Sequence, residues 1–166
     1  MKVGRDFALR SLRQRVPSAA SCPGRLHCAS GLDHRGAGRQ DRRLETPAWR
    51  VLETSHPPTY YLPRKAFADR VLRETSGSSW CEWKGQATYY DLVTTTRVAA
   101  QAAWSYLHPS PGFEPIADAV AVMAALVDRC TVNGEQVVPQ PGGFYGGWIT
   151  SWIVGPVKGV PGSMEW

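Results

Sequence analysis

The chain has 166 residues, 43% of them apolar, which is enough for one domain with a hydrophobic core, and its 16 glycines and 13 prolines predict many turns and few long helices. No apolar run approaches the roughly 18 residues of a membrane span. Residues 1–43 carry ten Lys and Arg against three Asp and Glu, whereas residues 44–166 carry nine against eleven. The net charge of +5 therefore comes from the first quarter, and we do not expect the folded part to bind nucleic acid or a membrane.

Residues 1–46 are rich in Arg, Gly, Ala and Ser and lack a sustained apolar period. Such a segment buries too little apolar surface to offset the entropy lost on ordering it. We interpret it as disordered, or as a misassigned leader, that adds nothing to the fold. Phe7, Leu9 and Leu12 among basic residues are also compatible with a mitochondrial-type presequence. A single globular domain is predicted over residues 47–166.

The four cysteines, Cys22, Cys28, Cys81 and Cys130, share no disulfide-framework spacing. Cys22 and Cys28 flank His27, but their spacing is too wide for one ligand pair of a zinc knuckle. Reduced thiols in a cytoplasmic protein are the simpler interpretation. Neither a metal nor a cofactor is predicted.

Short strands are predicted to follow. Residues 49–54 and 59–62 combine β-branched, aromatic and apolar side chains, and Pro57 and Pro58 between them cannot donate to a ladder. Residues 65–70 favour one helical turn. Residues 76–79 (Ser-Gly-Ser-Ser) favour a loop.

The clearest strand pattern is at residues 87–94, where side chains alternate between two faces. One face carries Ala87, Tyr89, Asp91 and Val93, and the other carries Thr88, Tyr90 and Leu92. A turn at residues 94–97 leads into a second long strand at residues 98–106.

The C-terminal half mixes patterns. Residues 115–128 are alanine-rich with apolar residues at helical spacing, which favours a helix, but a strand is the open alternative and the sequence does not decide between them. Residues 130–138 predict a β-hairpin, because Asn133-Gly134 supplies the two positive φ angles of a type I′ turn. The last 28 residues, rich in Gly, Pro and aromatic residues, predict an irregular segment that wraps the domain and inserts its rings.

Four blocks of sequence, SHPPTYYLP, CEWKG, AAWSY and VPQPGGFYGGWITSWIVGPVKGVPGSMEW, resemble the bacterial domain-of-unknown-function 427 family. The resemblance covers residues 49–166. It implies a mainly β fold, a small antiparallel β-tent or barrel-like domain with one or two short helices and no established reaction. Some relatives of that architecture hold zinc on paired CxxC knuckles, which this chain lacks.

The chain departs from the family pattern in two places. Family members usually have a β-hairpin before the LETSHPP block, and residues 27–46 show none, which predicts an unpaired sheet edge beside residues 49–54. Relatives also tend to have an aromatic strand where this chain has residues 119–125. The family label is sometimes nucleotidyltransferase-like. That chemistry needs two carboxylates for Mg²⁺, and Gly77-Ser78 is followed by Asp91 alone, with Val93 at the second position.

Three residues carry the candidate chemistry. Glu53 lies three residues before His56, and a carboxylate near an imidazole can fix its tautomer and raise its basicity. Lys84 presents an ammonium to an anion, and Gly85 leaves the backbone open to the ligand. Purely structural roles, in a turn for Glu53 and His56 and in a solvated loop for Lys84, are the alternative. Cys81 has no neighbouring cation in sequence and is not predicted to be a nucleophile.

The remaining site residues are aromatic. We expect the pocket to be lined by Tyr60, Trp83, Trp104 and Tyr106. The predicted function is binding of a small anionic or nucleotide-like ligand, with or without turnover. A non-catalytic interaction module that uses the aromatic C-terminal segment is the alternative, and a nucleotidyltransferase is a less favoured one.

Overall fold

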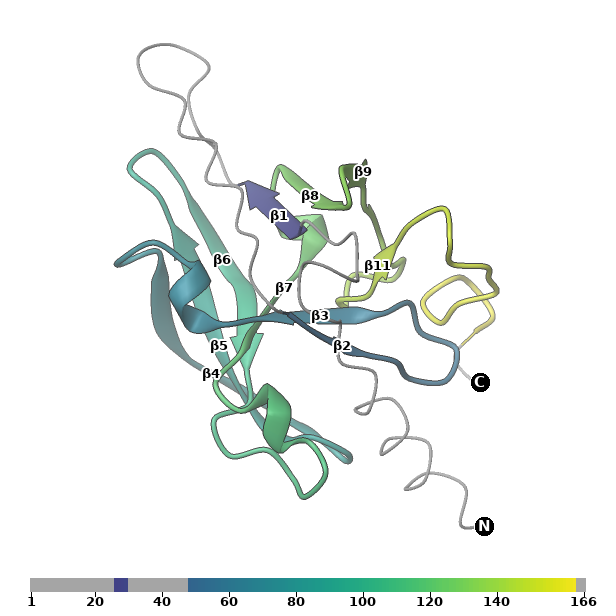
Figure 1. Ribbon diagram of the computed structural model, residues 1–166, viewed down its shortest axis with the longest axis horizontal. Helices are drawn as coiled ribbons and strands as arrows, with labels where there is room; N and C mark the ends of the chain where they lie inside the picture. The colour runs from purple at the N-terminus through teal and green to yellow at the C-terminus, as the bar shows by residue number, and fades with distance from the viewer. Residues whose placement is uncertain (1–25, 30–47, 164–166) are drawn as a thin grey trace.

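An open antiparallel sheet of six strands is the largest element of the protein, whose computed structural model describes residues 26–29 and 48–163 (Figure 1). In spatial order its strands are β2 (Trp49–Val51), β3 (Thr59–Leu62), β7 (Val120–Val122), β6 (Val98–Ser105), β5 (Gly85–Val93) and β4 (Leu72–Cys81). Two small sheets join β1 (Leu26–Ala29), β8 (Arg129–Val132) and β9 (Glu135–Gln136), and β10 (Val138–Pro139) with β11 (Trp148–Ile149). The predicted mainly β fold is confirmed, although the sheet does not close into a barrel.

Helical structure in these residues is limited to the three-residue 3-10 turns η1 (Arg64–Ala66), η2 (Glu114–Ile116) and η3 (Ala124–Leu126). The turn predicted at residues 65–70 corresponds to η1. Within the described ranges, no helix has the length and apolar character needed to cross a bilayer.

Strands β4, β5 and β6 form a long antiparallel meander. The predicted strands at residues 87–94 and 98–106 are confirmed as β5 and β6, and Thr94 and Arg97 close the turn between them through their backbones (N to O, 2.8 Å). The alternation of β5 is confirmed too, since Tyr90 and Leu92 enter one core and Ala87 and Tyr89 the other. The loop predicted at residues 76–79 is wrong. These residues continue β4, because pairing with β5 resumes at Ser78 after a bulge.

Residues 115–128, which the sequence leaves undecided between helix and strand, form a strand between two 3-10 turns. Strand β7 runs between β3 and β6, fully buried, where Ala121 pairs with Tyr61 on one side and Trp104 on the other. The rings of Tyr61 and Trp104 meet edge to face, with centroids 6.4 Å apart. A small residue between them on the strand leaves room for both rings. Alanine at this position therefore reflects packing, although its propensity favours a helix.

The hairpin predicted at residues 130–138 is present as β8 and β9. Asn133 (φ 56°) and Gly134 (φ 84°) occupy the left-handed region that a type I′ turn requires. On its other edge β8 pairs with β1, from Leu26 opposite Val132 to Ala29 opposite Arg129. Residues 26–29, within the leader predicted to add nothing to the fold, thus form a strand on the open edge of β8. The remainder of that leader, including the presequence motif, lies outside the described residues.

The sheet buries both faces. One core contains Tyr60, Tyr90 and Trp148 and is covered by the small sheets, and the other contains Tyr61, Trp104 and Tyr106 and is covered by the segment between β6 and β7. At one end of the described sheet β2 is the last strand, and the residues in which the family's preceding hairpin was sought lie mostly outside the described ranges.

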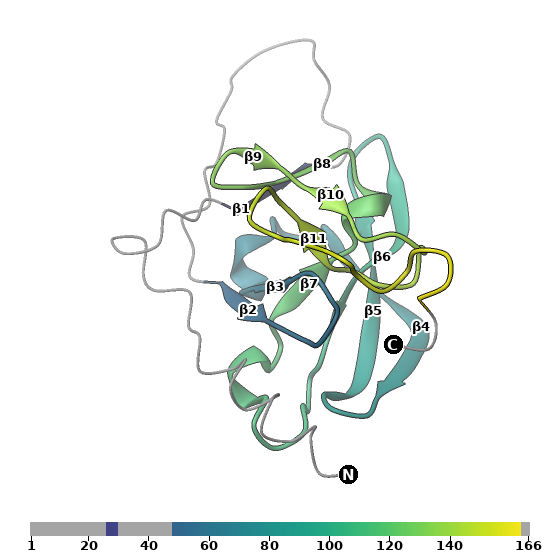
Figure 2. The same ribbon diagram turned by 90° about the vertical axis from the view of Figure 1, so that its right-hand side faces the viewer.

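Residues 139–163, here called the C-terminal strap, follow the predicted irregular course. The strap lies beside the β2–β3 connection in both views (Figures 1 and 2), where the Trp148 amide donates to the Pro58 carbonyl (2.9 Å). Ring insertion is only partly as predicted. Trp148 is 1% exposed, whereas Phe144 and Trp152 are 75% and 62% exposed.

Candidate functional site

A buried lysine and a partly exposed glutamate form the centre of the candidate site. Lys84 lies in the three-residue turn between β4 and β5, which closes on Gly85 in the left-handed region (φ 90°). Its Nζ lies 2.6 Å from Oε1 of Glu53, in the connection between β2 and β3. The Lys84 side chain is 7% exposed and that of Glu53 is 31% exposed. The alternative interpretation of Lys84, a solvated lysine in a loop, is therefore wrong. The hairpin turn buries it against a carboxylate.

Aromatic rings surround the ammonium. Nζ of Lys84 lies 6.0 Å from the ring centroids of Tyr106 and Phe113, at the outer limit of a cation–π contact. Burial raises the pKa of the Tyr106 hydroxyl, and the nearby Cys81 and Glu53 raise it further. The pKa of Tyr61 is also raised, first by burial, then by Tyr106 and Glu53. Both phenols stay neutral, and Glu53 and Lys84 carry the charges of this cluster.

His56 is held by an amide rather than by Glu53. Its Nδ1 lies 3.0 Å from Nε2 of Gln140, and its ring meets Tyr145 edge to face at 4.6 Å. Burial lowers the pKa of His56, while the charge of Glu53 partly opposes this shift. Between Glu53 and His56 the structure gives a backbone hydrogen bond, from the His56 amide to the Glu53 carbonyl (3.1 Å). The side chain that contacts Nδ1 of His56, and so fixes the imidazole tautomer, is Gln140, whereas Glu53 was expected in that role.

The orientation of the Gln140 amide is determined by its other partners. Oε1 accepts from the Gly147 amide (3.2 Å), and Nε2 donates to the Lys158 carbonyl (3.0 Å). The group facing His56 is therefore an N–H donor. Nδ1 must accept, so His56 is neutral with its proton on Nε2.

The other predicted site residues divide between the two cores. Trp104 and Tyr106 lie on the same side of the sheet as Tyr61, but Tyr60 packs on Trp148 in the opposite core (5.3 Å), which removes it from the cluster. Trp83, beside Lys84 in the hairpin turn, is 40% exposed.

Gly85 lies close to the segment of residues 108–110. A Cβ there would come within 3.3 Å of the Ser110 hydroxyl and 3.6 Å of the His108 carbonyl. The Ser110 amide donates to the Lys84 carbonyl (3.1 Å), so the 108–110 segment is fastened to the same turn.

The sequence reasoning missed four residues of this neighbourhood: Tyr61, Phe113, Gln140 and Tyr145. Gln140 had a signal, since a lone amide between two prolines (VPQPGG) in an apolar segment is unlike a solvated side chain. The strap glycines had another. A Cβ on Gly146 would lie 2.1 Å from the Trp104 ring, and one on Gly147 would lie 2.3 Å from Oε1 of Gln140. These glycines let the backbone lie directly on the site.

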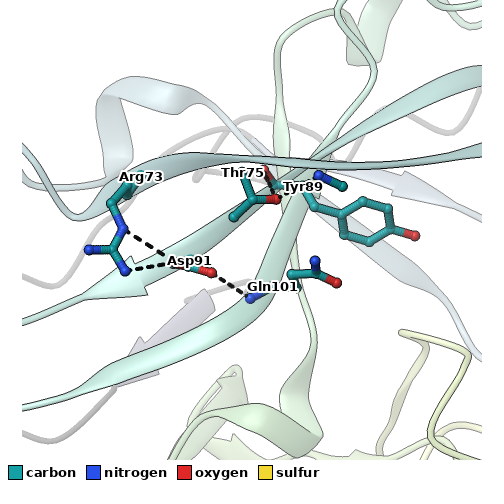
Figure 3. A network of polar contacts seen from close by, with 6 residues as sticks. Arg73, Thr75, Tyr89, Asp91 and Gln101 are labelled. Atoms are coloured by element: carbon teal, nitrogen blue, oxygen red, sulfur yellow. Dashed lines mark hydrogen bonds and ion pairs between the residues drawn. The ribbon is translucent and has the colours of Figure 1, made fainter.

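The carboxylate singled out for a nucleotidyltransferase lies in a separate polar network on the meander (Figure 3). Oδ2 of Asp91 accepts from the guanidinium of Arg73 (2.8 Å for the shorter bond), and Oδ1 accepts from the Gln101 amide (2.9 Å). The hydrogen bond from Gln101, and then Arg73, lowers the pKa of Asp91. Gln101 itself has a positive φ of 48°, in the bulge where pairing of β5 with β6 shifts. Asp91 thus fastens three strands together.

Among the side chains that the structure describes, no cluster of three or more His, Cys, Asp or Glu residues could hold a metal ion. Cys81 is a free thiol. The spacing of Cys22 and Cys28 around His27 concerns side chains outside the described set.

Comparison with known proteins identifies the family. No curated protein matches the chain. The family model described as Domain of unknown function (DUF427) matches residues 44–133, which include Glu53, His56, Lys84, Trp104 and Tyr106. Gln140 and the rest of the strap lie beyond the matched residues. The chain belongs to the DUF427 family.

Proposed function

We propose that this domain binds a small ligand at the cluster of Glu53, His56 and Lys84, with Glu53 as the group that meets the ligand. The observation that carries this proposal is the burial of Lys84. Removing an ammonium from water costs several kcal/mol unless it is paired, and replacing a buried ion pair by apolar residues is often neutral or stabilising. Stability alone therefore does not require the Glu53–Lys84 pair. Both residues lie in connections between strands, where a functional role is a reason to keep them.

The pairing favours one of the two predicted ligand classes. Because Glu53 already balances the charge of Lys84, a fully anionic group must displace the carboxylate before it reaches the ammonium. A nucleotide-like ligand whose base donates an N–H to Glu53 requires no displacement. The half-exposed ring of Trp83 lies in the same turn as Lys84 and is suited to stacking on a base. We therefore propose a nucleobase or nucleoside group as the recognised part.

Thermal-shift measurements with three compound sets test this proposal: nucleobases and nucleosides, inorganic phosphate with simple carboxylates, and amines. A ligand present at 100 times its Kd adds about 2.7 kcal/mol to the stability of the folded state. We expect a rise in Tm with the first set only. The binding variant is Glu53→Gln with Lys84→Met, which removes both charges together and so leaves no unpaired ion.

The matched control is Arg97→Met with Asp128→Asn, which removes an exposed ion pair (2.8 Å) elsewhere on the domain. This control is expected to keep the ligand-induced shift, and the Glu53/Lys84 variant to lose it. If the ligand still raises the Tm of the Glu53/Lys84 variant, the ligand binds at another site. A shift with phosphate or carboxylates alone supports the anionic ligand class instead.

A second candidate function rests on a different observation. Phe144, Trp152 and Val154 of the strap are 75%, 62% and 89% exposed, and large exposed apolar side chains close in sequence are a feature of protein interaction sites. We propose this surface as the alternative, a protein-interaction module. A stoichiometric protein partner that is lost from Phe144→Ser with Trp152→Ser, and kept by Leu126→Ser on η3, would favour it over ligand binding.

A further inference from the structure

The connection between His56 and the C-terminal strap forms a closed ring of hydrogen bonds. Gln140 bonds both Nδ1 of His56 and the carbonyl of Lys158, each at 3.0 Å. The amide of Lys158 in turn donates to the carbonyl of Ser55 (2.8 Å), the residue before His56. Gln140 is 3% exposed, so water does not readily replace these bonds. Two connections thus hold residue 158 of the strap to the turn at residues 55–56. One is the backbone bond to Ser55, and the other runs through the buried amide of Gln140.

This ring tolerates only one protonation state of His56. In the neutral form Nδ1 accepts from Nε2 of Gln140. In the imidazolium both ring nitrogens are donors, so an N–H would face an N–H across 3.0 Å. Rotating the Gln140 amide to relieve this contact would turn its oxygen toward the Lys158 carbonyl and its nitrogen toward the Gly147 amide. Protonation of His56 without rotation breaks the hydrogen bond to Gln140, and rotation of the amide breaks its bonds to Lys158 and Gly147. Either change loses a hydrogen bond that holds the strap.

We propose that His56 and Gln140 form a pH-sensitive clamp, which holds the C-terminal strap on the domain while His56 is neutral and releases it when His56 takes up a proton. The inference concerns the protein without any ligand, so it does not depend on the proposed function.

The charged groups around His56 oppose one another. Glu53 favours the imidazolium, whereas Lys158 and Lys84 disfavour it. The edge of the Tyr145 ring covers the imidazole from the strap. Burial is the largest of these influences and lowers the pKa of His56 below its ordinary value of 6.5. A strap-open form, in which the ring is hydrated, therefore binds the proton more tightly than the closed form.

The sign of the pH dependence follows from this difference. Above pH 6.5 both forms are neutral and the clamp is at full strength. As pH falls below 6.5 the open form takes up a proton first, so attachment weakens by up to about tenfold per pH unit until the closed form is protonated as well.

Hydrogen exchange of the full chain tests the clamp at pH 7.5 and pH 5.5, corrected for intrinsic exchange rates. We expect about a three- to tenfold loss of protection at pH 5.5 in peptides covering residues 145–160, with β5 and β6 unchanged. His56→Asn supplies an acceptor oxygen near the Nδ1 position without titrating, and its protection should be independent of pH. His108→Asn, which removes an exposed histidine, should behave as the parent chain does.

The tautomer is measured directly by nitrogen NMR of the unsubstituted protein, so the inference remains testable if His56→Asn does not fold. We expect His56 to carry its proton on Nε2 at pH 7.5. A proton on Nδ1, an unchanged strap at pH 5.5, or a loss of protection that persists in His56→Asn would each overturn the clamp.

Discussion

Removing one partner of the Glu53–Lys84 pair should have a very different effect from removing the other. Glu53→Ala leaves the ammonium of Lys84 unpaired in a site where its side chain is only 7% exposed. Breaking a buried ion pair in this way typically costs 3–5 kcal/mol, and we take about 3 kcal/mol because the Glu53 side chain is 31% exposed. Lys84→Met removes the buried charge, keeps an apolar stem near Tyr106 and Phe113, and leaves Glu53 partly hydrated, so its cost should be below about 1 kcal/mol.

Denaturant unfolding and thermal melting measure the difference. For a domain of this size we expect Tm to fall by about 6–12 °C in Glu53→Ala and by at most about 4 °C in Lys84→Met. The double variant should be close to Lys84→Met, which corresponds to a coupling of about 3 kcal/mol between the two positions. The exposed Arg97–Asp128 pair, with side chains 66% and 44% exposed, is the control, and either single removal there should cost under about 1 kcal/mol. Two results would refute this reasoning: a loss of stability in Lys84→Met as large as that in Glu53→Ala, or a loss in the double variant equal to the sum of the single losses. In either case burial of the ammonium does not cost stability, and the Glu53–Lys84 pair is no longer evidence for function.

Three further substitutions or deletions have expected outcomes that melting and hydrogen exchange can check. Gly146→Ala places a Cβ 2.1 Å from the buried Trp104 ring and should lower the free energy of unfolding by about 1–3 kcal/mol. Gly77→Ala is the control and should cost less, because its Cβ meets the flexible end of a glutamine side chain. Equal Tm values for the two variants would contradict the rigid contact at Gly146. Gly134→Ala has open space around its Cβ but a φ of 84°, so we expect a loss of about 1 kcal/mol from backbone strain alone, and no loss would argue against the type I′ turn. Deleting residues 1–31 removes β1 and should speed amide exchange in β8 while leaving β5 and β6 protected; unchanged exchange in β8 would show that the pairing contributes little.

Local sequence patterns were sufficient where the structure depends on near neighbours. Period-two alternation predicted β5, and Asn133-Gly134 predicted the hairpin, because side-chain direction and positive φ angles are properties of a few consecutive residues. The aromatic-polar blocks also identified Glu53, His56, Lys84 and Tyr106 as neighbours, without any measure of their burial. Local signals left β7 undecided, because alanine favours a helix by propensity, whereas in this strand it leaves room for two rings from adjacent strands.

Only the tertiary structure decided how the site residues are used. Glu53 and Lys84 are 31 positions apart, and His56 and Gln140 are 84 apart, so neither contact leaves a trace in local periodicity. Whether Lys84 is solvated or buried depends on which segments pack over its turn, and that arrangement follows from the order of strands in the sheet. The protonation state of His56 depends in the same way on an amide that the strap carries back across the domain. Charge, burial and hydrogen bonding at a site are set by residues distant in sequence, and here those residues come from three separate turns and a C-terminal strap.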